Sequence, residues 1–133
     1  MSTPHAMKIL IVDDCKTMRG IQKAVLARLG RVEVVEAASG REALARLSLF
    51  SPDVILCDWN MPVMDGLGFV RALRATDRRT PVIMVTTESE LPHVLEGIKL
   101  GANNYLLMPF TPDQLCQRIA ETLRTRPLLP AAA

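Results

Sequence analysis

Short apolar runs alternate along this chain with segments whose apolar residues recur every three or four positions. The runs are rich in β-branched residues, which is typical of strands buried on both faces. They predict strands at residues 8–12, 32–36, 53–57, 82–85 and 105–107. The segments between them predict helices. This alternation favours an α/β fold, in which helices cover both faces of a doubly wound, five-stranded parallel sheet.

Several helix ends carry recognisable caps. Ser39 and Glu42 have the spacing of a capping box, and Thr111 with Pro112 and Gln114 begins the last helix. The first helix is predicted from an apolar stripe, Met18, Ile21, Val25 and Leu29, with Gly30 as its C-terminal cap. A third helix is predicted between Asp65 and Arg74. A fourth is predicted at residues 90–100, with Pro92 in its first turn.

Length and composition fit one globular domain. The chain has 133 residues, of which 49% are hydrophobic and 23% charged, so it can bury a core of its own. No apolar run reaches the ~18 residues of a membrane span, and residues 1–7 lack the pattern of a secretory signal. We therefore expect a cytoplasmic protein with one domain at 7–125, an extension at 1–6 and a flexible tail at 126–133.

Cysteine and charge exclude several classes. Three cysteines without a CxxC spacing or a histidine cluster argue against disulfides and zinc. A formal net charge of +2 is too small to indicate a nucleic-acid partner, and we expect no membrane partner and a monomer. The arginines at 71, 74, 78 and 79 are predicted to form a solvated face.

Candidate chemistry gathers directly after the predicted strands. Asp13 and Asp14 follow the first strand, Asp58 the third and Thr86 the fourth. Ligands of parallel α/β sheets bind beyond the carboxyl ends of the strands, so these side chains are expected to converge. Adjacent aspartates also occur in ordinary turns and helix caps, but a third carboxylate weakens that explanation. Carboxylates in such a group suit a hard cation such as Mg²⁺.

Four motifs then occur in order, one at each expected strand end: VDDCKTMR, DWNMPVMDG, PVIMVTTE and GANNYLLMPF. Together they resemble the receiver domain of two-component response regulators, in particular the single-domain, CheY-like chemotaxis type. The resemblance covers residues 7–125. It implies the flavodoxin-like strand order 2-1-3-4-5.

The resemblance also implies roles for individual residues. Asp13, Asp14 and Asp58 would hold Mg²⁺ together with the backbone carbonyl of Asn60, and Asp58 would accept a phosphoryl group from a histidine kinase. Thr86 would then hydrogen-bond the phosphoryl group. Switching would be completed by an inward rotation of the Tyr105 ring.

One position departs from the family pattern. The family has a lysine before the proline of LLMPF, and this chain has Met108. A neutral thioether supplies neither a positive charge for phosphoryl oxygens nor a ligand for Mg²⁺. We expect metal binding to persist, phosphorylation or switching to be impaired, and the bond from Met108 to Pro109 to be cis as in the family. Met108 could equally be a residue that simply fills space.

Three functions remain in view. The first is a phosphoacceptor that is not an enzyme beyond slow loss of its own phosphoryl group, with a histidine kinase, a phosphotransfer protein or a flagellar switch component as partner, contacted beside Tyr105. The second is a receiver-like interaction module that works without phosphorylation because of Met108. A phosphohydrolase is less well supported, because that class requires a D-x-D spacing and Cys15 stands two residues after Asp13.

Overall fold

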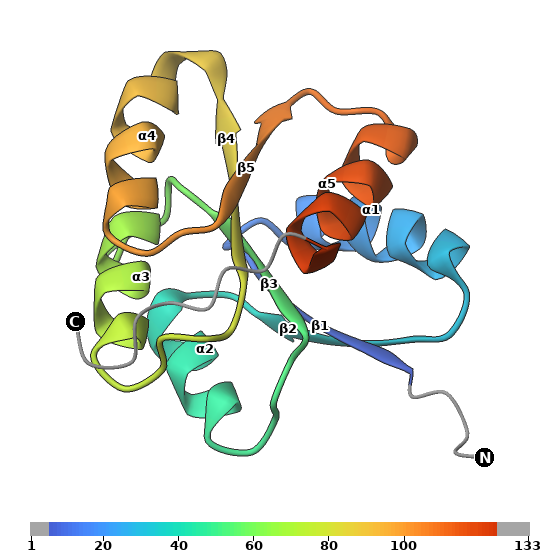
Figure 1. Cartoon of the computed structure of the whole chain (residues 1–133), viewed down its shortest axis with the longest axis horizontal. Helices are drawn as coiled ribbons and strands as arrows, with labels where there is room; N and C mark the ends of the chain where they lie inside the picture. Colours follow the sequence, from blue (N-terminus) through green and yellow to red (C-terminus); the bar gives the residue numbers. More distant parts are fainter. Residues whose placement is uncertain (1–5, 125–133) are drawn as a thin grey trace.

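A single parallel sheet forms the centre of the protein (Figure 1). The computed structural model describes residues 6–124. Its strands are β1 (Met7–Val12), β2 (Val32–Ala37), β3 (Val54–Asp58), β4 (Val82–Thr87) and β5 (Asn104–Met108). They are ordered β2-β1-β3-β4-β5, and every neighbouring pair is parallel. The predicted fold class and strand order are therefore confirmed.

Helices cover both faces of the sheet. Their bounds are α1 (Lys16–Leu26), α2 (Gly40–Leu47), α3 (Gly66–Arg74), α4 (Leu91–Lys99) and α5 (Pro112–Arg124), with 3-10 turns at Ala27–Leu29 and Glu88–Glu90. Figure 1 shows α2, α3 and α4 on one face and α1 and α5 on the other. In the described residues, no helix is long and apolar enough to cross a membrane.

The strands divide their side chains between two cores. In β1, Leu10 and Val12 belong to the core under α2, α3 and α4, whereas Ile9 and Ile11 belong to the core under α1 and α5. The same alternation runs through β3 and β4. Successive strand residues point to opposite faces, so a strand buried on both sides is apolar at every position. This explains why the central strands appear in the sequence as uninterrupted apolar runs.

The predicted N-terminal caps are present, whereas α1 ends at Leu26 and the predicted C-terminal cap, Gly30, instead ends the 3-10 turn Ala27–Leu29. The Ser39 hydroxyl accepts a hydrogen bond from the Glu42 backbone N–H at 3.1 Å, and Asp65 caps α3 in the same way through Gly68 at 2.8 Å. Thr111 and Gln114 bond to each other reciprocally at the start of α5. These bonds satisfy N–H groups that a helix leaves unpaired in its first turn.

Strands β4 and β5 extend further than predicted. The parallel pairing continues to Thr87 opposite Met108, two residues beyond the predicted end of β4. Threonine is β-branched and suits a strand, and no turn residue interrupts the pairing there. Met108 is thus the last residue of β5. The predicted extension and tail lie almost wholly outside the described residues, so that division of the chain stays a prediction.

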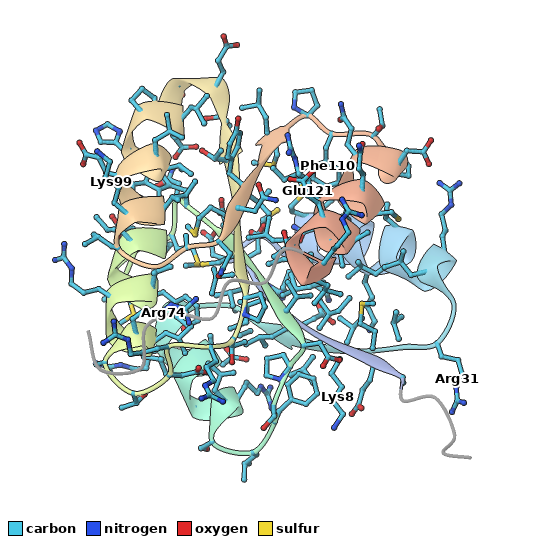
Figure 2. The ribbon with its side chains drawn as sticks, viewed as in Figure 1. Lys8, Arg31, Arg74, Lys99, Phe110 and Glu121 are labelled. Carbon is cyan, nitrogen blue, oxygen red and sulfur yellow. The ribbon has the colours of Figure 1, made fainter. Side chains whose placement is uncertain are left out.

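The prediction of a solvated arginine face is wrong for Arg74. Figure 2 places this residue at the C-terminal end of α3. Its half-buried guanidinium donates to the backbone oxygens of Asp77, Thr80 and Gly101 and to the side-chain oxygen of Asn103, at 2.8 to 3.1 Å. Arg74 therefore ties the end of α3 to the segments that lead into β4 and β5.

Candidate phosphorylation and metal site

Three carboxylates meet at the carboxyl edge of the sheet. Asp13 and Asp14 follow β1, and Asp58 ends β3. One carboxylate oxygen of each residue lies within 4.8 Å of those of the other two. Strands β1 and β3 are paired neighbours with Val12 opposite Cys57, so their ends coincide. The three aspartates predicted to form one site do lie together.

The chain holds Asp13 at several points. The backbone N–H of Cys15 donates to Asp13 Oδ1 at 2.8 Å, and Gln22 Nε2 donates to Oδ2 at 3.4 Å. The guanidinium of Arg19 donates to the Asp13 backbone oxygen at 2.6 Å. The first two contacts hold the carboxylate and the third holds the backbone of a residue that is only 2% exposed.

The three charges oppose one another in the metal-free protein. Burial, together with the charge of Asp13, raises the pKa of Asp58 to about 7. Burial also raises the pKa of Asp13, against the hydrogen bond from Cys15. Carboxylates crowded in a partly desolvated place favour the protonated form unless a cation joins them.

The donor set fits Mg²⁺. Within residues 6–124, this cluster offers carboxylate oxygens alone, with neither histidine nor thiolate as a ligand. Hard divalent cations prefer such oxygens, and Mg²⁺ is commonly held by one or two carboxylates while it keeps several waters. The exposure of Asp14 and the partial exposure of Asp58 leave the cluster accessible from solvent.

The loop after Asp58 stays close to it. The Asn60 backbone N–H donates to Asp58 Oδ1 at 3.4 Å, and Trp59 donates its backbone N–H to Val85. The Trp59 ring stacks on His93 of α4, with centroids 6.2 Å apart. The residue next to the candidate acceptor is thus in contact with a helix on the surface.

The same loop contains a strained residue. Val63 is fully exposed and has a φ of 70°, and the N–H of Met64 bonds to the Pro62 oxygen at 2.8 Å. A positive φ is costly for a β-branched side chain, because its Cβ substituents crowd the backbone. The loop keeps this conformation although Val63 has no burial to offset it.

Thr86 and Tyr105 do not join the carboxylate cluster. Thr86 is fully buried, and its hydroxyl donates to the backbone oxygen of Thr87 at 3.1 Å. Tyr105 is partly buried on β5, and its ring lies 5.4 Å from the guanidinium carbon of Arg118 on α5. In the described residues neither hydroxyl has a hydrogen bond to a carboxylate of the cluster, and the roles of both residues in switching stay predictions.

Met108 lines an apolar hollow between α1 and the ends of β4 and β5. The hollow has a volume of about 370 Å³ and is formed by Met18, Ile21, Thr87, Met108, Pro109 and Phe110. The bond from Met108 to Pro109 is cis, as expected. The last residue of β5 thus places a thioether among mostly apolar groups.

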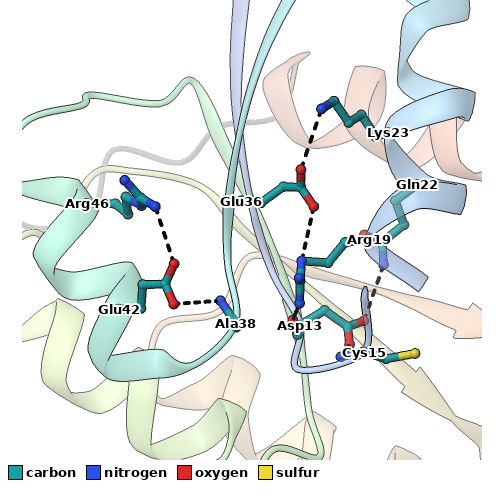
Figure 3. A network of polar contacts seen from close by, with 9 residues as sticks. All are labelled: Asp13, Cys15, Arg19, Gln22, Lys23, Glu36, Ala38, Glu42 and Arg46. Carbon is teal, nitrogen blue, oxygen red and sulfur yellow. Dashed lines mark hydrogen bonds and ion pairs between the residues drawn. The ribbon is translucent and has the colours of Figure 1, made fainter. Parts of the chain in front are cut away.

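A polar network around Asp13 was not foreseen from the sequence. Figure 3 shows Arg19 and Gln22 reaching from α1 toward the end of β1. Arg19 also pairs with Glu36 of β2 at 3.0 Å, and Lys23 approaches the same carboxylate at 3.5 Å. One signal was available: Gln22 is a polar residue on the apolar stripe of this helix.

Comparison with known proteins decides the family. The response regulator receiver domain family matches residues 9–120. The chain belongs to this family. Chemotaxis protein CheY1 of Helicobacter pylori is 44% identical over 122 residues, which are 90% of this chain and 98% of that protein. Chemotaxis protein CheY of Pseudomonas aeruginosa is 44% identical over 115 residues, covering 85% of this chain and 93% of that one.

Solved receiver structures agree with the fold. Vibrio cholerae chemotaxis protein CheY4 superposes with a TM-score of 0.81 and 39% identity, covering 88% of this chain and 98% of that one. A response regulator receiver domain protein of Clostridium thermocellum gives 0.82 and 30%, covering 89% and 94%. The chain is thus the receiver domain of a CheY-like response regulator in two-component signalling. Such domains generally bind Mg²⁺ at an acidic pocket.

Proposed function

We propose that this receiver accepts a phosphoryl group on Asp58 from the phosphohistidine of a kinase or phosphotransfer protein. The observation that carries the proposal is the cluster of Asp13, Asp14 and Asp58 at the ends of two adjacent strands. Asp58 is partly exposed, so a donor can reach it, while Asp13 is buried and held by the chain. One carboxylate serves as acceptor, and its neighbours hold the cation.

The transfer is a substitution at phosphorus. An Asp58 carboxylate oxygen forms a bond to the phosphorus, the bond from phosphorus to the donor nitrogen breaks, and the imidazole leaves with that electron pair. Bound Mg²⁺ supplies positive charge that offsets the repulsion between the carboxylates and the phosphoryl oxygens. Asp13, Asp14 and the Asn60 carbonyl would hold it with Asp58. The backbone N–H of Asn60 steadies Asp58 Oδ1.

The phosphohistidine is the donor of the phosphoryl group, and the protein's own Asp58 is the acceptor. Asn60 and Glu88 stand two residues after Asp58 and Thr86, at the rim of the site, where their polar side chains can meet a hydrolytic water. They set the lifetime of the phosphoryl group. The expected turnover is a slow loss of the protein's own phosphoryl group.

The signal leaves through a protein partner at the surface of α4, β5 and α5. A hollow of about 320 Å³ lies there beside Tyr105. Its lining consists of Tyr105, Leu106, Leu107, Pro109, Gln114, Gln117 and Arg118. A kinase, a phosphotransfer protein or a flagellar switch component fits this role. Substitution of Lys99, Tyr105 or Arg118 should weaken capture of that partner.

The direct test is labelling with acetyl phosphate, read as the mass of the intact protein. Wild type should gain one phosphoryl group in Mg²⁺ and none in excess chelator, and Asp58→Asn should gain none. Asp53→Asn is the matched control, because Asp53 is a carboxylate that directly precedes the same strand, where it accepts a hydrogen bond from the Lys8 backbone N–H. Labelling of Asp58→Asn at the wild-type rate would refute the assignment of the acceptor.

A second candidate is an interaction module that works without phosphorylation. The observation that favours it is the apolar hollow at Met108, where the family pattern has a lysine. In this case a partner would bind wild type and Asp58→Asn equally, and acetyl phosphate or a cognate kinase would label neither. Equal capture of both proteins, together with absent labelling, selects this function over the first.

A further inference from the structure

Gln22 is an unusual residue for its position. It lies on the buried stripe of α1 and is 1% exposed, and Leu26, one turn further along, is fully buried and apolar. A core residue at such a position is normally apolar, because a buried amide gives up its hydrogen bonds to water. A reason for a glutamine must therefore come from its contacts.

Only one of the two polar atoms of the Gln22 amide forms a hydrogen bond. Nε2 donates to Asp13 Oδ2, whereas Oε1 is buried and has no hydrogen-bond partner among the described residues. The reverse amide orientation would set Oε1 against the Asp13 carboxylate and leave Nε2 without an acceptor. A buried polar atom without a partner costs about 1 to 3 kcal/mol, so an apolar residue of similar size would serve the core better. Stability alone does not explain Gln22.

The contact that Gln22 does make reaches a metal-site carboxylate. Cys15 N–H holds Asp13 Oδ1 and Gln22 Nε2 holds Oδ2, so each carboxylate oxygen has a donor from the chain. Two donors on one carboxylate restrict its rotation, and partners that orient a ligand raise metal affinity. Figure 3 shows both contacts on the same side chain.

We propose that Gln22 is a positioning residue of the metal site, which orients the Asp13 carboxylate for a divalent cation. This inference rests on the proposed function, since it requires that the aspartates bind Mg²⁺. Gln22 touches neither the cation nor the phosphoryl group and acts through Asp13. The unpaired Gln22 oxygen costs stability, and the same side chain fixes the orientation of the Asp13 carboxylate.

The test compares wild type with Gln22→Met, using Mg²⁺ alone as the probe. Mg²⁺ affinity is measured by calorimetry and by the fluorescence of Trp59, and the metal-free protein is melted by circular dichroism. Gln22→Met should bind Mg²⁺ about tenfold more weakly. Its metal-free unfolding temperature should be equal or higher, because the unpaired oxygen is gone. A residue with a merely structural role would lower the unfolding temperature and leave the affinity unchanged.

Two further variants separate the causes. Leu26→Met changes another buried residue of α1 that makes no contact with the carboxylates, and it should leave Mg²⁺ affinity at the wild-type value. Gln22→Asn keeps an amide but is one methylene too short to reach Asp13, so its affinity should fall as in Gln22→Met. If Gln22→Met is poorly folded, Gln22→Asn carries the test.

The outcomes distinguish this inference from the function on which it rests. Wild type that binds no Mg²⁺ overturns both. Wild type that binds Mg²⁺, together with Gln22→Met and Gln22→Asn of equal affinity, overturns the role of Gln22 and leaves the metal site standing. Weaker binding by both variants, with Leu26→Met unchanged, supports the proposal.

Discussion

The two halves of the carboxyl edge of the sheet differ in their chemistry. The ends of β1 and β3 bring three carboxylates within 4.8 Å of one another. The ends of β4 and β5 bring Thr86, whose hydroxyl is engaged by the backbone, and Met108, which lines an apolar hollow. The first half therefore offers the oxygen ligands that a divalent cation needs. At the ends of β4 and β5, Met108 brings no positive charge, so the two halves can be tested separately.

The largest effect on Mg²⁺ binding is expected from a substitution in the charged half of the edge, formed by the ends of β1 and β3. Asp13→Asn removes a buried carboxylate from the cluster and should abolish Mg²⁺ binding, because an amide leaves the cation with fewer anionic ligands. Calorimetry measures the loss, and Trp59 fluorescence should no longer respond to Mg²⁺. Asp113→Asn, at an exposed carboxylate on α5, should bind as wild type does. A wild type whose fluorescence and chemical shifts ignore Mg²⁺ would remove the site altogether.

The next largest effect should be the pH dependence of the free energy of unfolding. The pKa of Asp58 is raised from 3.8 to about 7, so the folded, metal-free protein binds a proton that the unfolded chain releases. Its stabilising contribution is complete below the unfolded pKa and is lost as pH rises through about 7. Between pH 5 and 7 the free energy of unfolding should fall by up to about 1.4 kcal/mol per pH unit.

Denaturant titrations followed by circular dichroism at pH 5, 6 and 7 measure this slope. Asp58→Asn has no such carboxyl group and should show a flatter profile. Saturating Mg²⁺ should also flatten it, since the cation stabilises the ionised form. A metal-free wild type that becomes more stable from pH 5 to 7 would contradict the electrostatic account of the charged half.

Met108→Lys tests the neutral half of the edge, formed by the ends of β4 and β5. A unit charge about 4 Å away is worth ~1 kcal/mol in water and ~4 kcal/mol at an effective dielectric of 20, before desolvation. We expect acetyl phosphate to label Asp58 about tenfold faster, which is ~1.4 kcal/mol of activation free energy. Mg²⁺ should bind more weakly, because a second cation competes for the same carboxylates.

Leu107→Lys is the matched control for this change. It adds the same charge one residue earlier on β5, where side chains point to the opposite face of the sheet. Leu107 is 37% exposed and accepts a lysine without burial. Equal labelling rates for wild type, Met108→Lys and Leu107→Lys would mean that the missing charge is irrelevant and that the two halves are not divided as described.

The smallest effect concerns the loop after Asp58. Val63→Asn should raise the free energy of unfolding by about 1 kcal/mol, because asparagine tolerates a positive φ at lower cost. The denaturant midpoint measures this gain. Leu49→Asn, at another exposed apolar residue, should give no such gain. Unchanged Mg²⁺ affinity in Val63→Asn would show that the backbone strain at Val63 does not affect the carboxylate cluster. Altered affinity would show that the strain and the metal site are coupled.

The ends of β1 and β3 were predicted within one residue because their signal is local, whereas the end of β4 was predicted two residues too early. An apolar run that stops on Asp13 or Asp58 marks both a strand and its edge, and parallel pairing then brings the edges together. Gln22 was overlooked because the apolar pattern around it was strong enough to predict the helix without it. Its contact with Asp13 depends on how α1 lies against β1, which no spacing in the sequence states.

Arg74 was misjudged because its contacts are distant in the sequence. Composition shows that Arg74 is charged, but its acceptors at Gly101 and Asn103 lie 27 and 29 residues further along the chain. The fold brings those oxygens together, and they then bind a guanidinium that would otherwise remain in water. A pattern of charges in the sequence cannot distinguish such a residue from a solvated neighbour.

The Arg74 contacts also set how freely this corner of the protein can vary in sequence. Main-chain oxygens accept most of the hydrogen bonds, so the side chain of Thr80 can change without removing an acceptor. Gly101 is different. Its φ is +128°, and an added Cβ would lie 2.7 Å from Arg74 Cγ. The Arg74 contacts therefore restrict Arg74, Gly101 and Asn103, whose side chain is an acceptor, whereas Asp77 and Thr80 are restricted by the hydrogen bond between their own side chains.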